Sequence, residues 1–278
     1  MDKISLTIKR LYPTMGKAEK QVADWIEQNP KKIISLSIVE LAEQCGCSEA
    51  TIVRFSKRLG MSGFQELKIS LAAEGGGAAV STHIQKQDSP FEMFEKVSND
   101  IFLSLEKTRQ VLDPAGLKKA ADALCAAGKI ALFGLGNSAS VANDGAHKFL
   151  RAGLNAVAYS DNHMQVIAAS HLNQGDVAVG ISHSGSSKDI IDALTIAKEK
   201  GAITIAITNA GKSPIVKVAD VVLFTSAEET RHNILGLTSR LTQLAIIDAL
   251  YFSIVYNRSD EALESIRQTE KALQTKKF

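Results

Sequence analysis

The stretch VAVGISHSGSSKDIIDALTIAK, residues 177–198, joins an apolar, β-branched run to a serine-rich segment and then to a helical pattern. The run predicts a buried strand over 177–182, and the apolar spacing that follows predicts a helix over 188–200. The segment SHSGSS, residues 182–187, stands between them with four serines and one histidine. Because serine and glycine clusters commonly form turns and helix caps, the surroundings must decide whether this segment has a function.

The same alternation of apolar runs and helical patterns extends over residues 129–225. Helical patterns at 139–152, 164–172 and 188–200 separate most of the runs, whereas the last connection, 208–220, is short for a regular crossover. This order predicts an α/β domain with a five-stranded parallel, doubly wound sheet. The predicted strands are 129–133, 156–159, 177–182, 203–207 and 221–225, and long helical patterns at 90–112 and 117–127 precede them.

Two serine-rich segments fall where predicted strands end. GLGNSAS, residues 134–140, follows the first strand, and SHSGSS follows the third. Ligands of doubly wound sheets bind beyond the carboxyl ends of the strands. Unpaired N–H groups at a helix start, together with the hydroxyls of Ser182, Ser184 and Ser187, predict a cup for a phosphate monoester.

GLGNSAS also matches the dinucleotide pattern GxGxxA, and Asp161 follows at about the distance of a ribose-binding acid. A dinucleotide-binding redox sensor therefore remains an alternative to a phosphosugar-binding protein. No Walker A sequence is present, and the phosphosugar interpretation requires no cofactor.

The basic excess of the chain lies in its first quarter. Residues 1–73 carry 11 Lys and Arg against 8 Asp and Glu, a net of +3, and the remainder carries 21 against 22, a net of −1. An anionic partner for the first part is indicated. Its segments read as helices: 17–28, a capping-box start at Ser37 reaching residue 45, a helix from Ser48 to residue 59, and a second capping box, Ser62 with Gln65, before a last helix.

The middle two of these helices have the pattern of a helix-turn-helix. Gly46 permits the turn, and Cys45 and Cys47 are interpreted as packing residues, so that no metal site is expected. An ordinary pair of helices with a solvated face is the alternative. The remaining packing positions are Leu41, Ala42, Ile52 and Phe55, and the residues predicted to face DNA are Ser48, Glu49, Thr51, Arg54, Lys57 and Arg58.

Three consecutive glycines begin at residue 75 and indicate a flexible linker. We expect a helix-turn-helix domain over 1–74, a linker over 75–90 and an α/β domain over 91–278. The N-terminus lacks the apolar core of a signal peptide, and no apolar run approaches the ~18–20 residues of a membrane span. With three sparse cysteines, the expected compartment is the cytoplasm, and no membrane partner is expected.

Two sets of residues carry a family resemblance. GLGNSAS followed by ISHSGSSKD resembles the sugar-isomerase (SIS) domain, and SIVELAEQCGCSEATIVRFSKRLGMSGFQELK resembles the helix-turn-helix of the RpiR/MurR transcriptional regulators. The resemblance covers almost the whole chain and implies a regulator that binds operator DNA and a phosphosugar. The length is similar to that of RpiR-type repressors of sialic-acid catabolism, whose inducer is N-acetylmannosamine 6-phosphate.

The resemblance also implies ligand residues. Ser138, Ser182, Ser184 and Ser187 match phosphate-contacting hydroxyls, whereas His183 stands where relatives often carry Gln, Tyr or Phe. The other candidates are Asn137 and Ser140 beside the first loop, His163 as a sugar contact or a helix cap, and Glu229 after the fifth strand.

An aldose–ketose isomerase is a further alternative, because Glu228 or Glu229 with His232 or His163 would supply the proton transfer that such a reaction needs. We expect a regulator and not an enzyme, since an attached DNA-binding domain gives the binding event an output. The segment 234–255 is apolar on more than one face and predicts either burial within the domain or a subunit interface. A homodimer or higher homo-oligomer would place two DNA-binding domains on one operator. The large residues of the segment 234–255 include Leu241, Leu244, Ile247, Leu250 and Ile254.

Overall fold

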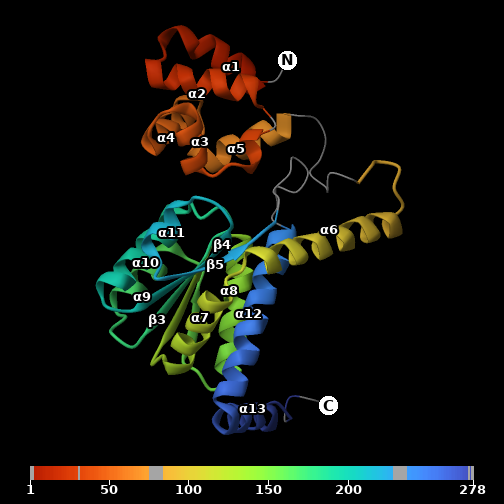
Figure 1. Cartoon of the computed structure of the whole chain (residues 1–278), viewed down its shortest axis with the longest axis vertical. Coiled ribbons are helices and arrows are strands. Elements are labelled where there is room, and N and C mark those ends of the chain that lie inside the picture. The colour runs from red at the N-terminus through yellow and green to blue at the C-terminus, as the bar shows by residue number, and fades with distance from the viewer. Residues whose placement is uncertain (1–2, 31, 75–83, 228–236, 275, 277–278) are drawn as a thin grey trace. The chain divides into compact units, whose positions relative to one another are not determined.

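The computed structural model describes residues 3–30, 32–74, 84–227, 237–274 and 276. The chain forms two compact units, which are divided within a long helix, α6 (Pro90–Val111), between Phe102 and Leu103. Residues 211–213, 237 and 238 also cluster with the first unit. Most of the elements of both units are labelled in Figure 1.

The first unit is helical, as the sequence predicts. The spans of α2 and α3 begin and end within a residue of their predicted bounds. Ile8, Val22, Leu41 and Phe55 are fully buried in one apolar core that all of its longer helices share. Its elements are α1 (Lys3–Leu11), η1 (Tyr12–Thr14), α2 (Lys17–Gln28), η2 (Lys32–Ser35), α3 (Ile38–Cys45), α4 (Glu49–Arg58) and α5 (Phe64–Glu74).

Capping chemistry places the turns of this unit. Ser37 forms the predicted capping box with Glu40, and Gly46 ends α3 with a φ of 62°, a left-handed conformation that favours glycine. The predicted partner of Ser62 was wrong. Glu66, and not Gln65, accepts the backbone N–H of Ser62 at 2.5 Å. Hydrogen bonds from Ser62 hold the pKa of the Glu66 carboxyl below its ordinary value.

The second unit contains the predicted five-stranded parallel sheet, with strand order β2-β1-β3-β4-β5. Its alternate side chains face two different cores. Ile130 and Leu132 belong to one core, and Ala131 and Phe133 belong to the other. The strands are β1 (Ile130–Gly134), β2 (Ala156–Tyr159), β3 (Val177–Ile181), β4 (Ile203–Asn209) and β5 (Val221–Thr225).

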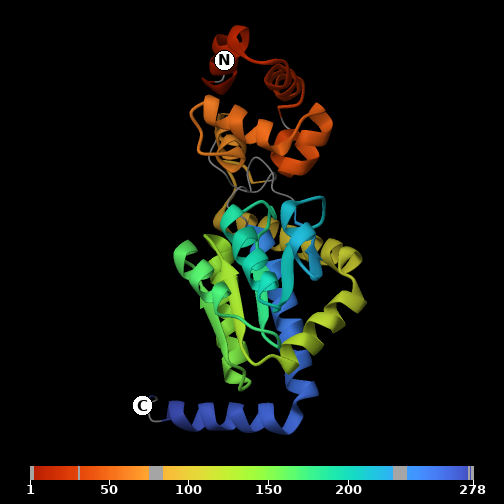
Figure 2. The same cartoon turned by 90° about the vertical axis from the view of Figure 1, so that its left-hand side faces the viewer.

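Helices cover both faces of the sheet, as Figure 1 shows. One face carries α7 (Pro114–Ala126), α8 (Asn137–Arg151) and α12 (Leu237–Asn257), and the other carries α9 (Asn162–Ser170), α10 (Lys188–Glu199) and α11 (Pro214–Val218). The short helix α11 fills the connection that looked too short for a crossover. A last helix, α13 (Ser259–Gln274), runs crosswise to α12 (Figure 2) and is held to α8 by an Arg151–Glu270 ion pair.

Strand register brings the two serine-rich segments together. β1 lies between β2 and β3, and Gly134 at the end of β1 pairs with Ile181 at the end of β3. The chain leaves β1 toward α8 on one face and leaves β3 toward α10 on the other. This is the switch point of a 2-1-3-4-5 sheet, where doubly wound proteins bind ligands.

Candidate functional site

The loop after β1 folds tightly over the end of its own strand. A Cβ on Gly134 would lie 2.5 Å from the backbone oxygen of Ser138, so only glycine fits. Gly136, the N-cap of α8, has a φ of 55°. The backbone N–H of Ser138 donates to Leu135 O at 3.1 Å, which closes the turn. GLGNSAS therefore places the N-terminus of α8 directly above the sheet edge.

The loop after β3 is held from several sides. The N–H of Ser182 donates to Ile207 O at 3.1 Å, and the N–H of Ile215 donates to Gly185 O at 3.0 Å. Gly185 has a φ of 61°. Ser182 is 6% exposed, whereas Ser184 and Ser187 are half-buried. Backbone bonds to β4 and α11 thus fix this loop beside the first one.

The helices that begin at these loops differ from their neighbours in their caps. Asp113 caps α7 and Asp161 caps α9, each through its carboxylate. Neither Gly136 before α8 nor Ser187 before α10 makes a side-chain cap bond. First-turn N–H groups lack partners within a helix, and the positive end of the dipole adds to their attraction for anions. In α8 the N–H groups of Ser138 and Ala139 already donate to Leu135 O and Gly136 O, both at 3.1 Å. The two helix ends without a side-chain cap lie at the carboxyl ends of β1 and β3, where the helix dipoles and the serine hydroxyls of both loops form a site suited to an anion.

Ser140 and His163 lie near the starts of α8 and α9, the helices that follow β1 and β2. The hydroxyl of Ser140 donates to Asn137 O at 2.7 Å, within the first turn of α8. His163 is exposed near the start of α9, and the alternative that it caps that helix is wrong, because Asp161 accepts the N–H of Met164 at 2.9 Å. The ribose-binding role considered for Asp161 therefore competes with its cap bond. Glu228, Glu229 and His232 lie outside the described residues.

Gln165 is a site residue that the sequence analysis missed. Its side chain is fully buried, and Nε2 donates to Tyr159 O at 2.9 Å and to Gly134 O at 3.2 Å. It therefore joins the ends of β1 and β2 under the GLGNSAS loop. Oε1 of Gln165 is buried and has no hydrogen-bond partner among the described residues. The only signal in the sequence was a glutamine on the otherwise apolar inner side of a predicted helix.

The DNA-facing prediction was wrong for Thr51. Ser48, Arg54 and Lys57 are exposed on α4, and Glu49 is half-buried. Thr51, in contrast, is only 5% exposed. Its hydroxyl lies 3.0 Å from Ser48 Oγ, and its N–H donates to the same oxygen at 3.3 Å. The residue therefore completes the cap of α4 together with Ser48.

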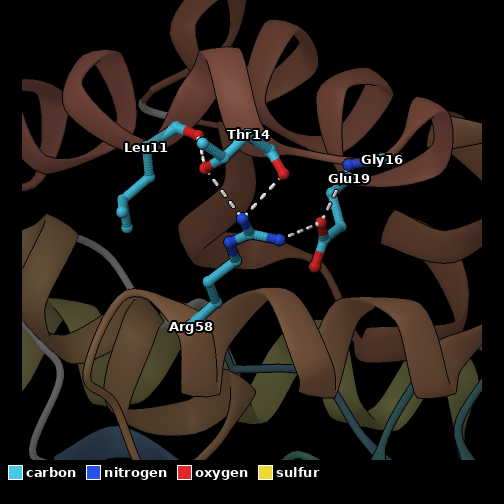
Figure 3. Close-up of polar contacts among 5 residues, drawn as sticks. All are labelled: Leu11, Thr14, Gly16, Glu19 and Arg58. Carbon is cyan, nitrogen blue, oxygen red and sulfur yellow. Dashed lines mark hydrogen bonds and ion pairs between the residues drawn. The ribbon is translucent and has the colours of Figure 1, made fainter.

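Arg58 makes contacts within the first unit that the sequence did not predict (Figure 3). Its Nη1 donates to Glu19 Oε2 at 2.8 Å, and its Nη2 donates to Thr14 O and Thr14 Oγ1 at 2.7 and 2.8 Å. The same Glu19 oxygen accepts the N–H of Gly16 at 3.1 Å. Arg58 therefore joins the end of α4 to the start of α2, and its guanidinium is engaged where the sequence analysis expected DNA.

The cysteines of the helix-turn-helix pack as predicted. Cys45 is buried in the core of the first unit, and Cys47 is partly buried against it. Burial, with a smaller contribution from Cys47, raises the pKa of the Cys45 thiol to about 12. A thiol with so high a pKa stays protonated near neutral pH and behaves as a small apolar group.

Comparison with known proteins finds a known domain family for each of the two units. The helix-turn-helix domain of the rpiR family matches residues 3–76, and the SIS domain matches residues 123–253. An uncharacterized HTH-type transcriptional regulator of Caldanaerobacter subterraneus is 36% identical over 100% of this chain and 99% of its own. The HTH-type transcriptional regulator HexR of Pseudomonas aeruginosa is 35% identical over 93% of this chain and 91% of its own.

Solved structures share the fold. Vibrio vulnificus NanR, complexed with ManNAc-6P, superimposes with a TM-score of 0.81 at 23% identity over 99% of this chain and 100% of its own. The sugar isomerase domain of an RpiR transcription factor from Sphaerobacter thermophilus gives 0.59 at 24% identity over 64% of this chain and 97% of its own.

The two units thus define a regulator that combines a helix-turn-helix domain with a sugar-phosphate-binding SIS domain. The chain belongs to the RpiR family of HTH-type transcriptional regulators. Among the described residues, no helix is long and apolar enough to cross a membrane.

Proposed function

We propose that this protein represses a sugar-catabolism operon and releases the operator when a phosphosugar binds at the carboxyl ends of β1 and β3. The first effector to test is N-acetylmannosamine 6-phosphate. In this proposal the protein senses the sugar phosphate in the cytoplasm without converting it.

One observation carries the ligand class. α8 and α10 start at the carboxyl ends of neighbouring strands, and neither helix has a side-chain cap. A phosphate there would receive bonds from backbone N–H groups and from serine hydroxyls of both loops. The proposed phosphate contacts are Ser138, Ser182, Ser184 and Ser187. The other proposed ligand-binding residues are Asn137, Ser140, His163, His183 and Glu229.

The choice of first effector rests on the NanR structure, whose ligand is ManNAc-6P. The HexR relatives are more similar in sequence than NanR is. Other hexose phosphates therefore belong in the same titration. Whichever sugar binds, it must bind the DNA-free state more tightly than the DNA-bound state, because equal affinities would shift nothing.

For the DNA, we propose that the exposed Ser48, Arg54 and Lys57 contact the operator. Short polar groups at the start of a recognition helix reach base edges, and basic groups further along reach phosphates. Thr51 and Arg58 then act indirectly, by holding α4 in place through Ser48 and Glu19.

The proposed homodimer or higher oligomer uses an exposed face of α12, a segment for which the sequence left burial within the domain and a subunit interface both open. Ile247, Leu250 and Ile254 are buried in the core of their own unit, so these residues cannot form a subunit interface. The opposite face is exposed and carries Phe252 at 58% and Tyr256 at 81%. These two lie four residues apart on one side of the helix. This face is the proposed subunit contact, and it would pair two DNA-binding units.

A gel-shift titration tests the proposal. The DNA is a duplex selected from random sequence by the protein, and the probes are N-acetylmannosamine 6-phosphate, glucose 6-phosphate and fructose 6-phosphate. We expect one of them to release the DNA. Release by a hexose phosphate other than the first would change the effector and keep the class, and failure of all three would contradict the proposal.

A double variant, Ser182→Ala with Ser184→Ala, locates the site. Losing two hydrogen bonds to a charged phosphate should weaken effector binding by about 100-fold, at about 1.4 kcal/mol each, and leave DNA binding unchanged. Ser170→Ala is the matched control, because its hydroxyl donates to Ile167 O within the last turn of α9 and has no other partner in the described part of the chain. Equal loss of DNA and effector binding in the double variant would indicate misfolding in place of a lost site.

A further inference from the structure

The loop after β3 is joined to the end of β4 through the carbonyl oxygen of His183. The N–H of Asn209 donates to that oxygen at 3.0 Å, and the hydroxyl of Thr208 donates to it at 3.3 Å. Thr208 is fully buried. Because His183 lies between Ser182 and Ser184, a movement of the serine-rich loop changes the position of the acceptor that both β4 residues share.

The side chain of Asn209 continues the connection to β5. Its Oδ1 accepts the N–H of Ala227 at 2.9 Å, and the N–H of Ala210 donates to Thr225 O at 2.7 Å. The backbone that follows β5 is therefore fixed to the same residue that holds His183. One residue further on, the chain enters 228–236, which includes the proposed effector contact Glu229.

The next hydrogen bond joins the chain after β5 to helix α6. The N–H of Ser226 donates to Thr108 Oγ1 at 2.9 Å, and the Thr108 hydroxyl donates to Ser104 O at 2.7 Å. Thr108 is 4% exposed, and its hydroxyl is both the acceptor from Ser226 and the donor to Ser104. α6 is shared by the two units, because residues 90–102 belong to the first and residues 103–111 to the second.

We infer that Asn209 and Thr108 couple the effector loop to helix α6, and hence to DNA binding, through the bonds His183–Asn209–Ala227 and Ser226–Thr108. The inference rests on the proposed function and assigns the route by which effector binding reaches the DNA-binding unit. All five residues lie in the second unit, so the route is continuous within one compact body up to α6. Each bond is buried or partly buried, and a shift at one end must therefore move or break the next bond.

Thr108→Val tests the route, because valine keeps the shape and removes the hydroxyl. The measured quantity is the coupling factor, the ratio of DNA dissociation constants with and without effector. Wild-type factors of about 5- to 150-fold are typical of allosteric proteins. We expect Thr108→Val to reduce the factor to below about twofold, and Thr108→Ser to restore it, because serine keeps the hydroxyl.

Thr195→Val is the matched control. The Thr195 hydroxyl donates to Ile191 O at 2.8 Å within α10, the same bond type as in Thr108, but among the described residues it has no partner outside its helix. We expect wild-type coupling in this control. A second pair of variants, at Asn209, distinguishes a loss of coupling from a folding defect. Asn209→Asp keeps the oxygen that accepts from Ala227 and should keep coupling, and Asn209→Leu should lose it.

A second arm needs no sugar. Coupling is reciprocal, so the selected DNA duplex should change hydrogen exchange at residues 182–187 in the wild-type protein and in Thr108→Ser, and not in Thr108→Val. If no phosphosugar binds the wild-type protein, the proposed function fails and this arm still decides the inference. Wild-type coupling in Thr108→Val, or unchanged exchange in the wild-type loop on DNA binding, would overturn it.

Discussion

Helix α4 of the first unit and helix α10 of the second both begin at a serine, and the two serines do different things. Ser48 accepts the N–H of Thr51 and thereby caps its own helix. Ser187 makes no side-chain cap bond, although it has the same residue type and extended backbone at the same helix position. The difference teaches how to recognise an anion site. A helix end whose N-cap side chain accepts a first-turn N–H is structural, and a helix end without such a cap at the carboxyl ends of the strands is available to a ligand.

The largest effect is expected at the effector edge. Gly134→Ala would place a Cβ 2.5 Å from the Ser138 backbone oxygen, an overlap that only a backbone shift can relieve. We expect a loss of about 3 kcal/mol of stability in the second unit. Hydrogen exchange of β3 measures it. Gly63→Ala, where an added Cβ meets nothing within 4 Å, is the control and should be nearly neutral. Equal stability of the two variants would contradict the tight loop.

Arg58→Ala is expected to have the next largest effect, in the first unit. It leaves the buried Glu19 carboxylate without its cation and should cost about 2 kcal/mol. Urea unfolding followed by the fluorescence of Trp25, the single tryptophan of the chain, reports this unit. Lys57→Ala, its exposed neighbour, should change stability by less than about 0.5 kcal/mol. Similar stability of both variants would show that Arg58 does not stabilise the first unit and would favour the predicted DNA contact instead.

The two serines provide the most direct test of the comparison. Ser48→Ala should cost about 1 kcal/mol of stability, because it removes a cap. Ser187→Ala should change stability by less than about 0.5 kcal/mol, because it removes none, and should instead weaken phosphosugar binding. Thermal unfolding and calorimetric titration measure the two quantities. A stability loss of the same size in both variants would show that Ser187 is a structural cap.

Arg54→Ala should have the smallest effect on stability, below about 0.5 kcal/mol, because its side chain is exposed on α4. It should weaken DNA binding and reduce the slope of log affinity against log salt by about 1 if it contacts a phosphate. Effector affinity should stay unchanged. An unaltered salt dependence would remove Arg54 from the proposed DNA contacts.

Short-range patterns were predictable from the sequence, and long-range partners were not. The strand and helix spans, the capping box at Ser37 and the left-handed Gly46 depend on residues within a few positions of one another. Gln65 was the wrong choice beside Ser62 because Glu66 reaches the same N–H with a charged group. Apart from the bond of Thr108 to Ser104 O within α6, the partners of Arg58, Gln165 and Thr108 are 6 to 118 residues away, and most of them are backbone atoms that no side-chain pattern reveals.

The sequence by itself determined a helix-turn-helix joined to a doubly wound sheet, with two serine-rich segments where strands end, because periodicity and turn chemistry are local properties. The tertiary structure decided that β1 and β3 are neighbours, which places GLGNSAS and SHSGSS side by side with two uncapped helix ends. It also decided that Thr51 is buried, that Arg58 binds Glu19, and that α12 exposes Phe252 and buries Leu250. The physical reason is that each of these outcomes depends on which surfaces pack together, and packing joins residues that are far apart in the chain.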